Sequence, residues 1–259
     1  MASCWFPRLR LPRDGVGGAG RAPWPGRHLL LAIVATGAMA CGDKEIPAAE
    51  LGARLFTSPG VSTSRFNKFA CATCHVVAAD AALVPAGRWD SGYNLYGVAG
   101  RPSWWGGGAL KLLDAINDCV DLFMGGKRLA ATDPQALQLG AYLATNSPPE
   151  AQPAAPLTVV RVVTPLADLT GAAARGAVIY AASCFRCHGA LHTGAGRLDD
   201  SVSILPEATL HFFPSNARAA FVEKIRHGRF FNIGGIMPFY SREAMSDADV
   251  ADVLAFIGL

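Results

Sequence analysis

The stretch Cys71-Ala72-Thr73-Cys74-His75 returns later in the chain as Cys184-Phe185-Arg186-Cys187-His188. Cys-x-x-Cys-His is the pattern to which c-type haem is attached. The two thiols lie about one helical turn apart, so each can form a thioether to one vinyl group of the same porphyrin, and the adjacent His turns its imidazole toward the iron. A bare Cys-x-x-Cys also occurs in redox dithiols and zinc sites, but a His directly after both copies favours haem. The sequence therefore predicts two covalently bound c-type haems.

The other cysteines do not form a disulfide framework. Of the seven cysteines, four belong to the two motifs, and the remaining three are Cys4, Cys41 and Cys119. Cys4 lies in a predicted leader and Cys41 at a predicted processing site, so only Cys119 is left over.

The first forty residues have the composition of an export signal. Five arginines precede an apolar run over 29–35, and small residues follow as Ala38-Met39-Ala40. The run is too short to span a bilayer permanently. Ala-x-Ala suits ordinary signal peptidase, whereas small residues directly before Cys41 resemble a lipoprotein signal in which that cysteine is acylated. We favour the lipoprotein signal, although Ala38 stands where Leu is more usual. We expect a protein on the periplasmic side of a bacterial membrane, anchored by a lipid on Cys41.

Charge argues against nucleic-acid binding. The whole chain carries 23 basic and 20 acidic residues, but the leader holds five Arg and one Asp, so the remainder has 18 basic and 19 acidic residues. No basic run with interleaved aromatic residues is present. We therefore expect no nucleic-acid partner; because the two motifs predict haem, we expect redox proteins, or a membrane respiratory complex, as partners.

The 219 residues after the leader suit two domains of about a hundred residues each. Residues 146–156 are rich in Pro and Ala and lack apolar periodicity, as in a semi-extended linker. Residues 157–163 are apolar and β-branched, and the sequence leaves open whether they form a short strand or an arm along one domain. The predicted boundaries are 41–145 for the first domain, 146–166 for the linker and 167–259 for the second domain.

An internal repeat relates the two predicted domains. Gly52 is followed four residues later by Phe56, and Gly176 is followed in the same way by Tyr180. Each domain ends in a predicted amphipathic helix with apolar residues at i, i+3, i+4 and i+7, namely Ala136, Leu139, Gly140 and Leu143, and Val250, Val253, Leu254 and Ile257.

Both terminal helices have N-terminal signals. Thr132-Asp133-Pro134 precedes the first and Ser246-Asp247 the second. In each pair the hydroxyl is expected to accept a free amide hydrogen, while Pro or an acid suits the first turn.

This arrangement resembles the class I cytochrome c family, in which the first and last helices cross at a small residue with an aromatic nearby. Gly52 and Gly176, with Tyr142 and Phe256, match those contact positions. The resemblance covers nearly all of the chain after the leader as two tandem modules. It implies an all-α fold wrapped around haem, whose apolar face provides much of the core.

The resemblance also suggests distal iron ligands. Met124 follows His75 by 49 residues, and Met237 follows His188 by 49. In the family the distal methionine comes from a loop at this place, and Met237-Pro238 matches the usual pattern. A thioether ligand favours reduced iron and raises the potential. The alternative for each Met is packing in the core, and we predict ligation by both.

Cys119 lies in a predicted helix that begins near Leu112 and ends at Met124. The Asn-x-Cys stretch resembles segments in cytochromes of the thiosulfate dehydrogenase and sulfur-oxidation families, where some haems are ligated by cysteine. A thiolate from Cys119 on the first iron is one reading, and a buried free thiol is the one we favour.

The histidines outside the motifs are not expected to bind iron. His28 belongs to the leader, and His192 is too near His188 to reach the opposite face of the same haem. His211 and His227 would become distal ligands only if Met237 were not one.

The first predicted domain has an insertion, residues 57–62, that is similar to the start of the dihaem cytochrome c peroxidase group. Members of that group leave one iron open, whereas both irons here have a candidate methionine. Aromatic residues follow the first motif, and we expect them to pack on the porphyrin rather than dock a partner. They are Trp89, Tyr93, Tyr96, Trp104 and Trp105.

These observations predict a dihaem c-type cytochrome that transfers single electrons between redox partners and needs no catalytic acid or nucleophile. The alternative is a small dihaem oxidoreductase acting on a sulfur anion or on peroxide, with the first haem as its active site. A haem-bearing subunit of a larger membrane complex would have the same ligation as a carrier.

Overall fold

The computed structural model describes residues 45–79, 89–158, 160–228 and 237–259. The predicted leader and Cys41 lie outside these ranges. All regular elements in the described part are helical, with one isolated bridge between Trp104 and Ala109. The predicted all-α fold is thus confirmed. In the same ranges, no helix combines the length and the apolar character needed to cross a bilayer.

In the described part of the N-terminal half, residues 45–79 and 89–158, there are four α-helices and three short 3₁₀ turns. The helices are α1 (Ala48–Phe56), α2 (Cys71–Cys74), α3 (Leu112–Leu122) and α4 (Pro134–Thr145), and the turns are η1 (Pro59–Val61), η2 (Val98–Gly100) and η3 (Trp105–Gly107).

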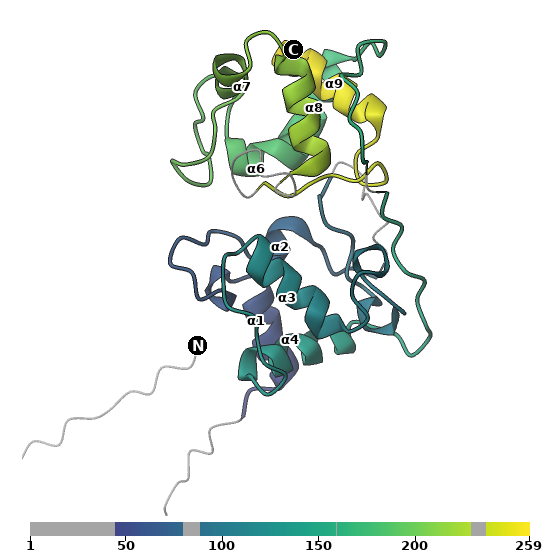
Figure 1. Ribbon diagram of the computed structural model, residues 1–259. Helices are drawn as coiled ribbons and strands as arrows, with labels where there is room; N and C mark the ends of the chain where they lie inside the picture. The colour runs from purple at the N-terminus through teal and green to yellow at the C-terminus, as the bar shows by residue number, and fades with distance from the viewer. Residues whose placement is uncertain (1–44, 80–88, 159, 229–236) are drawn as a thin grey trace, which may run out of the picture. The chain divides into compact units, whose positions relative to one another are not determined.

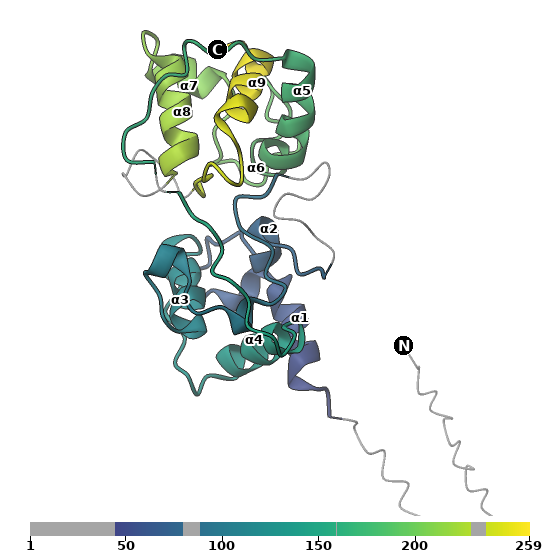
Figure 2. The same ribbon diagram turned by 90° about the vertical axis from the view of Figure 1, so that its right-hand side faces the viewer.

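The C-terminal half, as far as the structure describes it (160–228 and 237–259), has five α-helices and one π-helical turn. They are α5 (Ala173–Ile179), the turn η4 (Tyr180–Cys184), α6 (Phe185–His188), α7 (Glu207–Phe212), α8 (Ala217–His227) and α9 (Asp247–Ile257). Figures 1 and 2 show α1–α4 in one group and α5–α9 in another, with the motif helices α2 and α6 on the sides where the groups meet.

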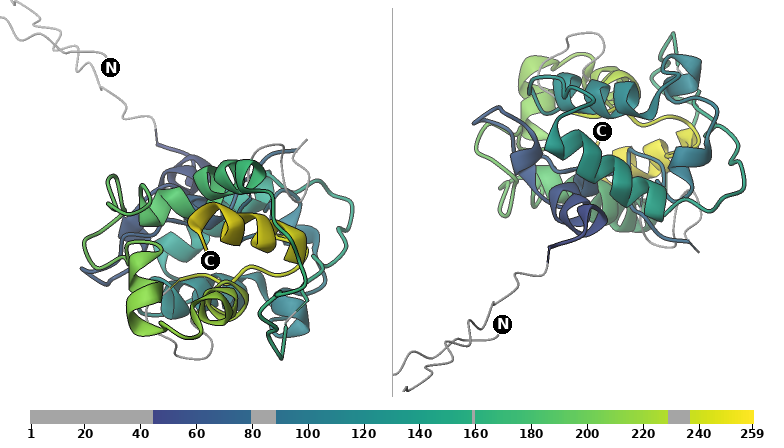
Figure 3. Two further views of the ribbon diagram at one scale, coloured as in Figure 1. Left: turned by 90° about the horizontal axis from the view of Figure 1, so that it is seen from above. Right: turned by 90° about the horizontal axis from the view of Figure 1, so that it is seen from below.

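Two helix crossings organise the halves, and each requires a glycine. α1 packs on α4, and α5 packs on α9 (Figure 3). A Cβ at Gly52 would lie 2.0 Å from the carbonyl oxygen of Gln138, and a Cβ at Gly176 would lie 1.9 Å from that of Asp252. Both distances are far below van der Waals contact, so the backbones approach this closely only because the side chain is absent.

The same aromatic pair accompanies each crossing. The rings of Phe56 and Tyr142 have centroids 5.4 Å apart at 52°. Those of Tyr180 and Phe256 are 5.5 Å apart at 55°. Tilted pairs at this distance are favourable for aromatic rings. The residues identified from the internal repeat therefore occupy equivalent places in the two crossings.

The cores follow the apolar periodicity of the terminal helices. In α9, Val250, Val253 and Leu254 have no exposed surface. Leu139 of α4 is likewise buried, in a cluster with Phe56 and Met124.

A charged contact strengthens the second crossing. The guanidinium of Arg175 on α5 bonds the carboxylates of Asp249 and Asp252 on α9. Burial alone would raise the pKa of Asp249, but hydrogen bonds from Ser246 and the Arg175 cation hold it below its ordinary value. The two buried carboxylates are thus paired, as burial of charge requires.

The two terminal helices begin differently. Ser246 caps α9 as predicted, because its hydroxyl accepts the Asp249 amide at 3.1 Å. The predicted cap by Thr132 is wrong. Asp133 is the N-cap of α4 and its side chain makes no cap bond; it accepts the Ala130 amide at 2.7 Å instead. The carboxylate turns back to stabilise the preceding turn, and Pro134 at the first helical position has no amide hydrogen that needs an acceptor.

The linker packs along the molecule as an arm. The Gly97 amide bonds the carbonyl of Asn146 at 3.0 Å, and the Gln152 amide bonds that of Gly100 at 3.2 Å. Farther along, the Thr158 amide bonds the carboxylate of Glu243 at 3.0 Å. The described part of 157–163 is irregular, so the arm rather than the strand is what this sequence forms.

Candidate functional site

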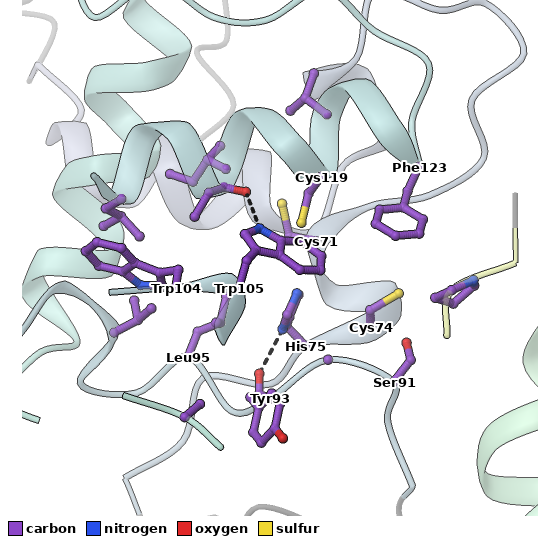
Figure 4. A pocket seen from close by; sticks show the side chains of 18 of the residues that line it. Cys71, Cys74, His75, Ser91, Tyr93, Leu95, Trp104, Trp105, Cys119 and Phe123 are labelled. Carbon is purple, nitrogen blue, oxygen red and sulfur yellow. Dashed lines mark hydrogen bonds between the residues drawn. The ribbon is translucent and has the colours of Figure 1, made fainter. Parts of the chain in front are cut away.

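The first motif is held on a single helical turn. Cys71 and Cys74 are the two ends of α2, and His75 follows in an extended conformation. The Nδ1 atom of His75 is 2.8 Å from the carbonyl oxygen of Tyr93 (Figure 4). A carbonyl only accepts, so Nδ1 carries the proton and Nε2 keeps its lone pair for a metal.

Gly92 gives the His75 ring its space. A Cβ at this position would lie 2.3 Å from Cε1 of His75. Sequence reasoning missed Gly92, because no local pattern marks a glycine whose neighbour is 17 residues away. Its place just before Tyr93 is the only signal that connects it to the ring.

A deep apolar pocket opens beside the first motif (Figure 4). His75, both motif cysteines, Met124 and Cys119 all line it, together with aliphatic and aromatic side chains from α1, α3 and α4. The structure therefore brings Cys71, Cys74, His75 and Met124, which were predicted to hold the first haem, to one cavity.

Met124 is fixed by the insertion after α1. It lies just after α3 and is 5% exposed. The hydroxyl of Ser62 donates to the Met124 carbonyl at 2.9 Å, and the hydroxyl of Thr63 accepts the Lys127 amide at 3.0 Å. Gly125 between them adopts a φ of +59°, which favours glycine. Sequence reasoning found Met124 but gave Ser62 no role.

Cys119 shares the pocket with the first motif. It projects from α3, and Figure 4 shows its sulfur next to that of Cys71. Burial raises the pKa of the Cys119 thiol strongly, and the neighbouring Cys71 and Cys74 add to the effect. Among the described residues, Cys119 forms no disulfide.

Trp105 forms an aromatic wall of the pocket. Its φ of +53° is uncommon for a bulky residue, and its indole donates to the Ala115 carbonyl of α3 at 3.4 Å. Its ring stacks on Phe123 at 6.2 Å and 14°, and lies 6.4 Å from that of Phe239. Trp104, Trp105 and Tyr93 thus line the pocket, whereas Trp89 packs against the core of the C-terminal half.

Two N–H donors give the pocket a polar part. The guanidinium of Arg101 bonds the Asn94 carbonyl at 2.7 Å, and burial lowers its pKa, opposed by Tyr93. Within the described residues, the buried indole Nε1 of Trp104 meets no hydrogen-bond acceptor. A buried donor of this kind is costly unless a ligand completes it. Haem is an apolar macrocycle with two carboxylates at its edge. The apolar walls of this pocket match the macrocycle and the two N–H donors match the carboxylates, so the pocket residues fit haem.

The second motif holds its imidazole by the same kind of hydrogen bond as the first, although its backbone differs. Cys184 is buried at the end of η4, and α6 carries Cys187 and His188. The Nδ1 atom of His188 is 2.8 Å from the carbonyl oxygen of Ser203. Burial lowers the pKa of His188, although this hydrogen bond raises it. The imidazole is therefore neutral near pH 7, with Nε2 available to a metal.

Met237 lies directly after residues that the structure does not describe, 229–236. It is half-buried and packs against the core cluster that contains Cys184 and Tyr180.

Arg226 anchors the segment that follows Met237. Its buried guanidinium donates to the carbonyls of Tyr240 at 3.1 Å and Met245 at 2.7 Å, and to the Asp247 carboxylate at 2.6 Å. Sequence reasoning missed Arg226, since these partners lie 14 or more residues away.

The remaining histidines make other contacts. His227 is bonded to the Glu223 carboxylate and the Val160 carbonyl, one through each ring nitrogen. His192 lies 2.6 Å from the Glu207 carboxylate, and His211 packs edge-on against Phe212.

Comparisons with known proteins bear on this arrangement. Residues 171–257 match the family described as cytochrome C oxidase, cbb3-type, subunit III. No curated protein matches the chain. Among solved structures, an as-isolated thiosulfate dehydrogenase (TsdBA) from Marichromatium purpuratum is similar, with 20% identity and a TM-score of 0.38, over 83% of this chain and 46% of that one. This chain thus spans less than half of that neighbour. The segment that matches this cytochrome c family contains the second motif and α5–α9.

Proposed function

We propose that this chain is a dihaem c-type cytochrome that passes single electrons between redox partners outside the cytoplasm. One observation carries the proposal. Each Cys-x-x-Cys pair is followed by an imidazole whose Nδ1 is held 2.8 Å from a backbone carbonyl, by Tyr93 in one case and by Ser203 in the other. At both sites the hydrogen bond at Nδ1 orients the imidazole so that Nε2 can bind a metal. This shared feature favours two haems that carry electrons in the same way.

The residues of the chain would hold and tune the two groups. Each haem, when attached, supplies a one-electron iron couple. The cysteines of each motif would tether it, the His would provide Nε2, and Met124 or Met237 would provide a thioether that favours reduced iron. At the first site, Arg101 and Trp104 would donate to the carboxylates of the group, and the apolar walls would exclude water from it. No group has to move a proton, which suits a carrier.

The proposed organisation is two tandem modules, 41–145 and 167–259, joined by 146–166. The equivalent glycine crossings at Gly52 and Gly176, with their equivalent aromatic pairs, support it. The predicted export signal and the lipid on Cys41 would place the protein on the periplasmic side of a membrane, where a respiratory complex is a suitable partner.

The test begins with haem content and ligation. The mature chain, produced in cells that attach c-type haem, should gain the mass of two haems. Low-temperature electron paramagnetic resonance and near-infrared magnetic circular dichroism of the oxidised protein should show two His/Met sites. Met124→Ala should remove one signature and Met237→Ala the other. A single haem, or an iron unaffected by both substitutions, contradicts the proposal.

A second function has one observation in its favour, the presence of Cys119 in the first pocket. In this alternative the chain is a small oxidoreductase, and the first haem is its active site for a sulfur anion or peroxide. Cys119→Ala decides between the two functions. The carrier predicts unchanged ligation, whereas a thiolate signature lost with Cys119 favours the enzyme and makes thiosulfate the first substrate to assay.

A further inference from the structure

The two Cys-x-x-Cys-His motifs contact each other directly. Arg186 lies inside the second motif, and its guanidinium donates a hydrogen bond to the carbonyl of Thr73, inside the first. Figures 1 and 2 show the corresponding helices, α6 and α2, on adjoining sides in both views. Nothing in the attachment chemistry of either motif requires this contact.

A buried carboxylate strengthens the contact. The Asp90 carboxylate lies 3.7 Å from the Arg186 guanidinium, and its side chain is 5% exposed, against 39% for Arg186. A carboxylate this deeply buried is stable only beside a cation. Arg186 is one cation beside it, and it comes from the other half of the molecule. The pair therefore fixes how the two motifs face each other.

The ring of Tyr240 lies in the same region. Burial raises its pKa well above the ordinary value, and Cys184, Cys74, Cys187 and Asp90 each raise it further. One buried aromatic side chain is thus near the cysteines of both motifs. Tyr240 is fixed in turn by its amide, which bonds the Ile225 carbonyl at 2.7 Å, and by Arg226.

We propose that Arg186, paired with Asp90, is a positioning residue that holds the two attachment motifs together and thereby sets the rate of electron transfer between the haems. This inference rests on the proposed function. One electron leaves one iron and is gained by the other, and no bond or proton is exchanged. The external donors and acceptors are one-electron redox proteins. Arg186 acts on the distance and on the packing between the motifs, not on the iron ligands.

The test compares Arg186→Leu with Arg128→Leu in the full-length holoprotein. Arg128 is a matched control, because it is 45% exposed and pairs with Asp118 at 2.8 Å within its own half. Intact mass and electron paramagnetic resonance first establish two attached, ligated haems in each variant. A photoreduced flavin or ruthenium complex then injects one electron, and the redistribution between the haems is followed optically. The midpoint potentials of both haems are measured in each variant. They show whether a slower rate comes from a smaller driving force or from a changed distance and packing between the motifs.

We expect Arg186→Leu to slow the redistribution by about tenfold or more with both ligation signatures intact, because small displacements of reacting groups have large kinetic effects. Arg128→Leu should match the wild type. Arg186→Lys should restore part of the rate, since Lys keeps the charge and one donor but not the planar guanidinium. Equal rates for the two Leu variants overturn the inference.

Asp90→Asn is the second variant, for use if Arg186→Leu fails to fold or to acquire haem. It keeps the shape of the side chain and removes the charge that Arg186 pairs with. A slower redistribution supports the inference, and an unchanged rate overturns it. A wild-type protein with only one haem overturns the proposed function as well, so the two failures are distinguishable.

Discussion

A single hydroxyl joins the insertion after α1 to the first predicted distal ligand. Ser62 donates to the Met124 carbonyl at 2.9 Å and accepts the Ser64 amide at 3.1 Å. Ser62→Ala removes the first bond, which is worth about 1 kcal/mol. We expect Met124 to leave the iron more readily, so that imidazole or cyanide displaces it at lower concentration in an optical titration.

Ser58→Ala is the control for Ser62. Its hydroxyl accepts the Gly60 amide at 3.1 Å, a bond that stays within the same insertion and does not involve the Met124 segment. The control should bind the external ligand as the wild type does. Equal affinities for the two variants would show that Ser62 does not restrain Met124.

Arg101 gives a prediction for the potential of the first haem. Its guanidinium lines the pocket beside Trp104. Arg101→Gln removes a positive charge that favours the reduced, less positive iron. The midpoint potential of the first haem should fall, by about 60 mV for each 1.4 kcal/mol lost in a one-electron couple. Potentiometric titration measures both haems at once, and the second serves as internal reference. A fall at both haems, or at neither, contradicts the assignment.

At the scale of elements, the two glycines of the α1–α4 pair behave oppositely. A Cβ at Gly52 would clash at 2.0 Å with the Gln138 carbonyl, whereas nothing lies within 4 Å of one at Gly140. Gly52→Ala should therefore lower the free energy of unfolding by about 1–3 kcal/mol or more. Gly140→Ala should raise it by about 0.5–1 kcal/mol, because alanine favours the helix. Denaturant unfolding of both holoproteins checks the pair, and a stable Gly52→Ala would rule out the close crossing.

Helices could be predicted where the sequence pattern that specifies them lies within the helix itself or at its first residues. The apolar spacing of Val250, Val253 and Leu254 predicts α9 and its buried face, and Ser246 predicts where it begins. The cap predicted at Thr132 is wrong, because the N-cap is the neighbouring Asp133. The Asp133 carboxylate accepts an amide of the preceding turn, and the sequence does not show that this turn needs an acceptor. The crossing glycines were found only by aligning the two halves. Neither periodicity nor propensity contains that information.

At the scale of the molecule, Glu243 ties the linker to the C-terminal half. Burial would raise its pKa, but hydrogen bonds from Thr158 and neighbouring groups lower it from an ordinary 4.5 to about 2. A carboxylate with a depressed folded pKa stabilises the fold above its unfolded pKa and loses that contribution as pH falls toward the folded one. This part of the stability should therefore disappear between about pH 4.5 and 2.

Glu243→Gln tests this linkage. The variant should lose stability at pH 7 and show a flatter dependence of the denaturant midpoint between about pH 4.5 and 2. Glu150→Gln, at an exposed position in the same linker, should keep the wild-type slope. If both variants follow the wild-type curve, Glu243 does not hold the linker.

The sequence predicted two haem motifs, their Met partners and the linker, but not how these parts meet. Ala155 and Leu157 of the linker line the first pocket, and so do Pro238 and Phe239, which directly follow Met237. Tyr93, whose carbonyl orients His75, also brings its hydroxyl within 3.3 Å of that of Ser241. Contacts of this kind join loops far apart in the chain. They depend on three-dimensional shape, and no residue pattern marks them in advance.

The contact between Arg186 and Thr73 also constrains how the protein is made. In the finished fold Cys74 and Cys187 lie near one buried ring, Tyr240, and the Arg186 cation closes the space between their motifs. An enzyme that joins porphyrin to these thiols needs room on both sides of each sulfur. If both motifs carry haem, as proposed, this contact predicts that attachment at the motifs precedes docking of the two halves.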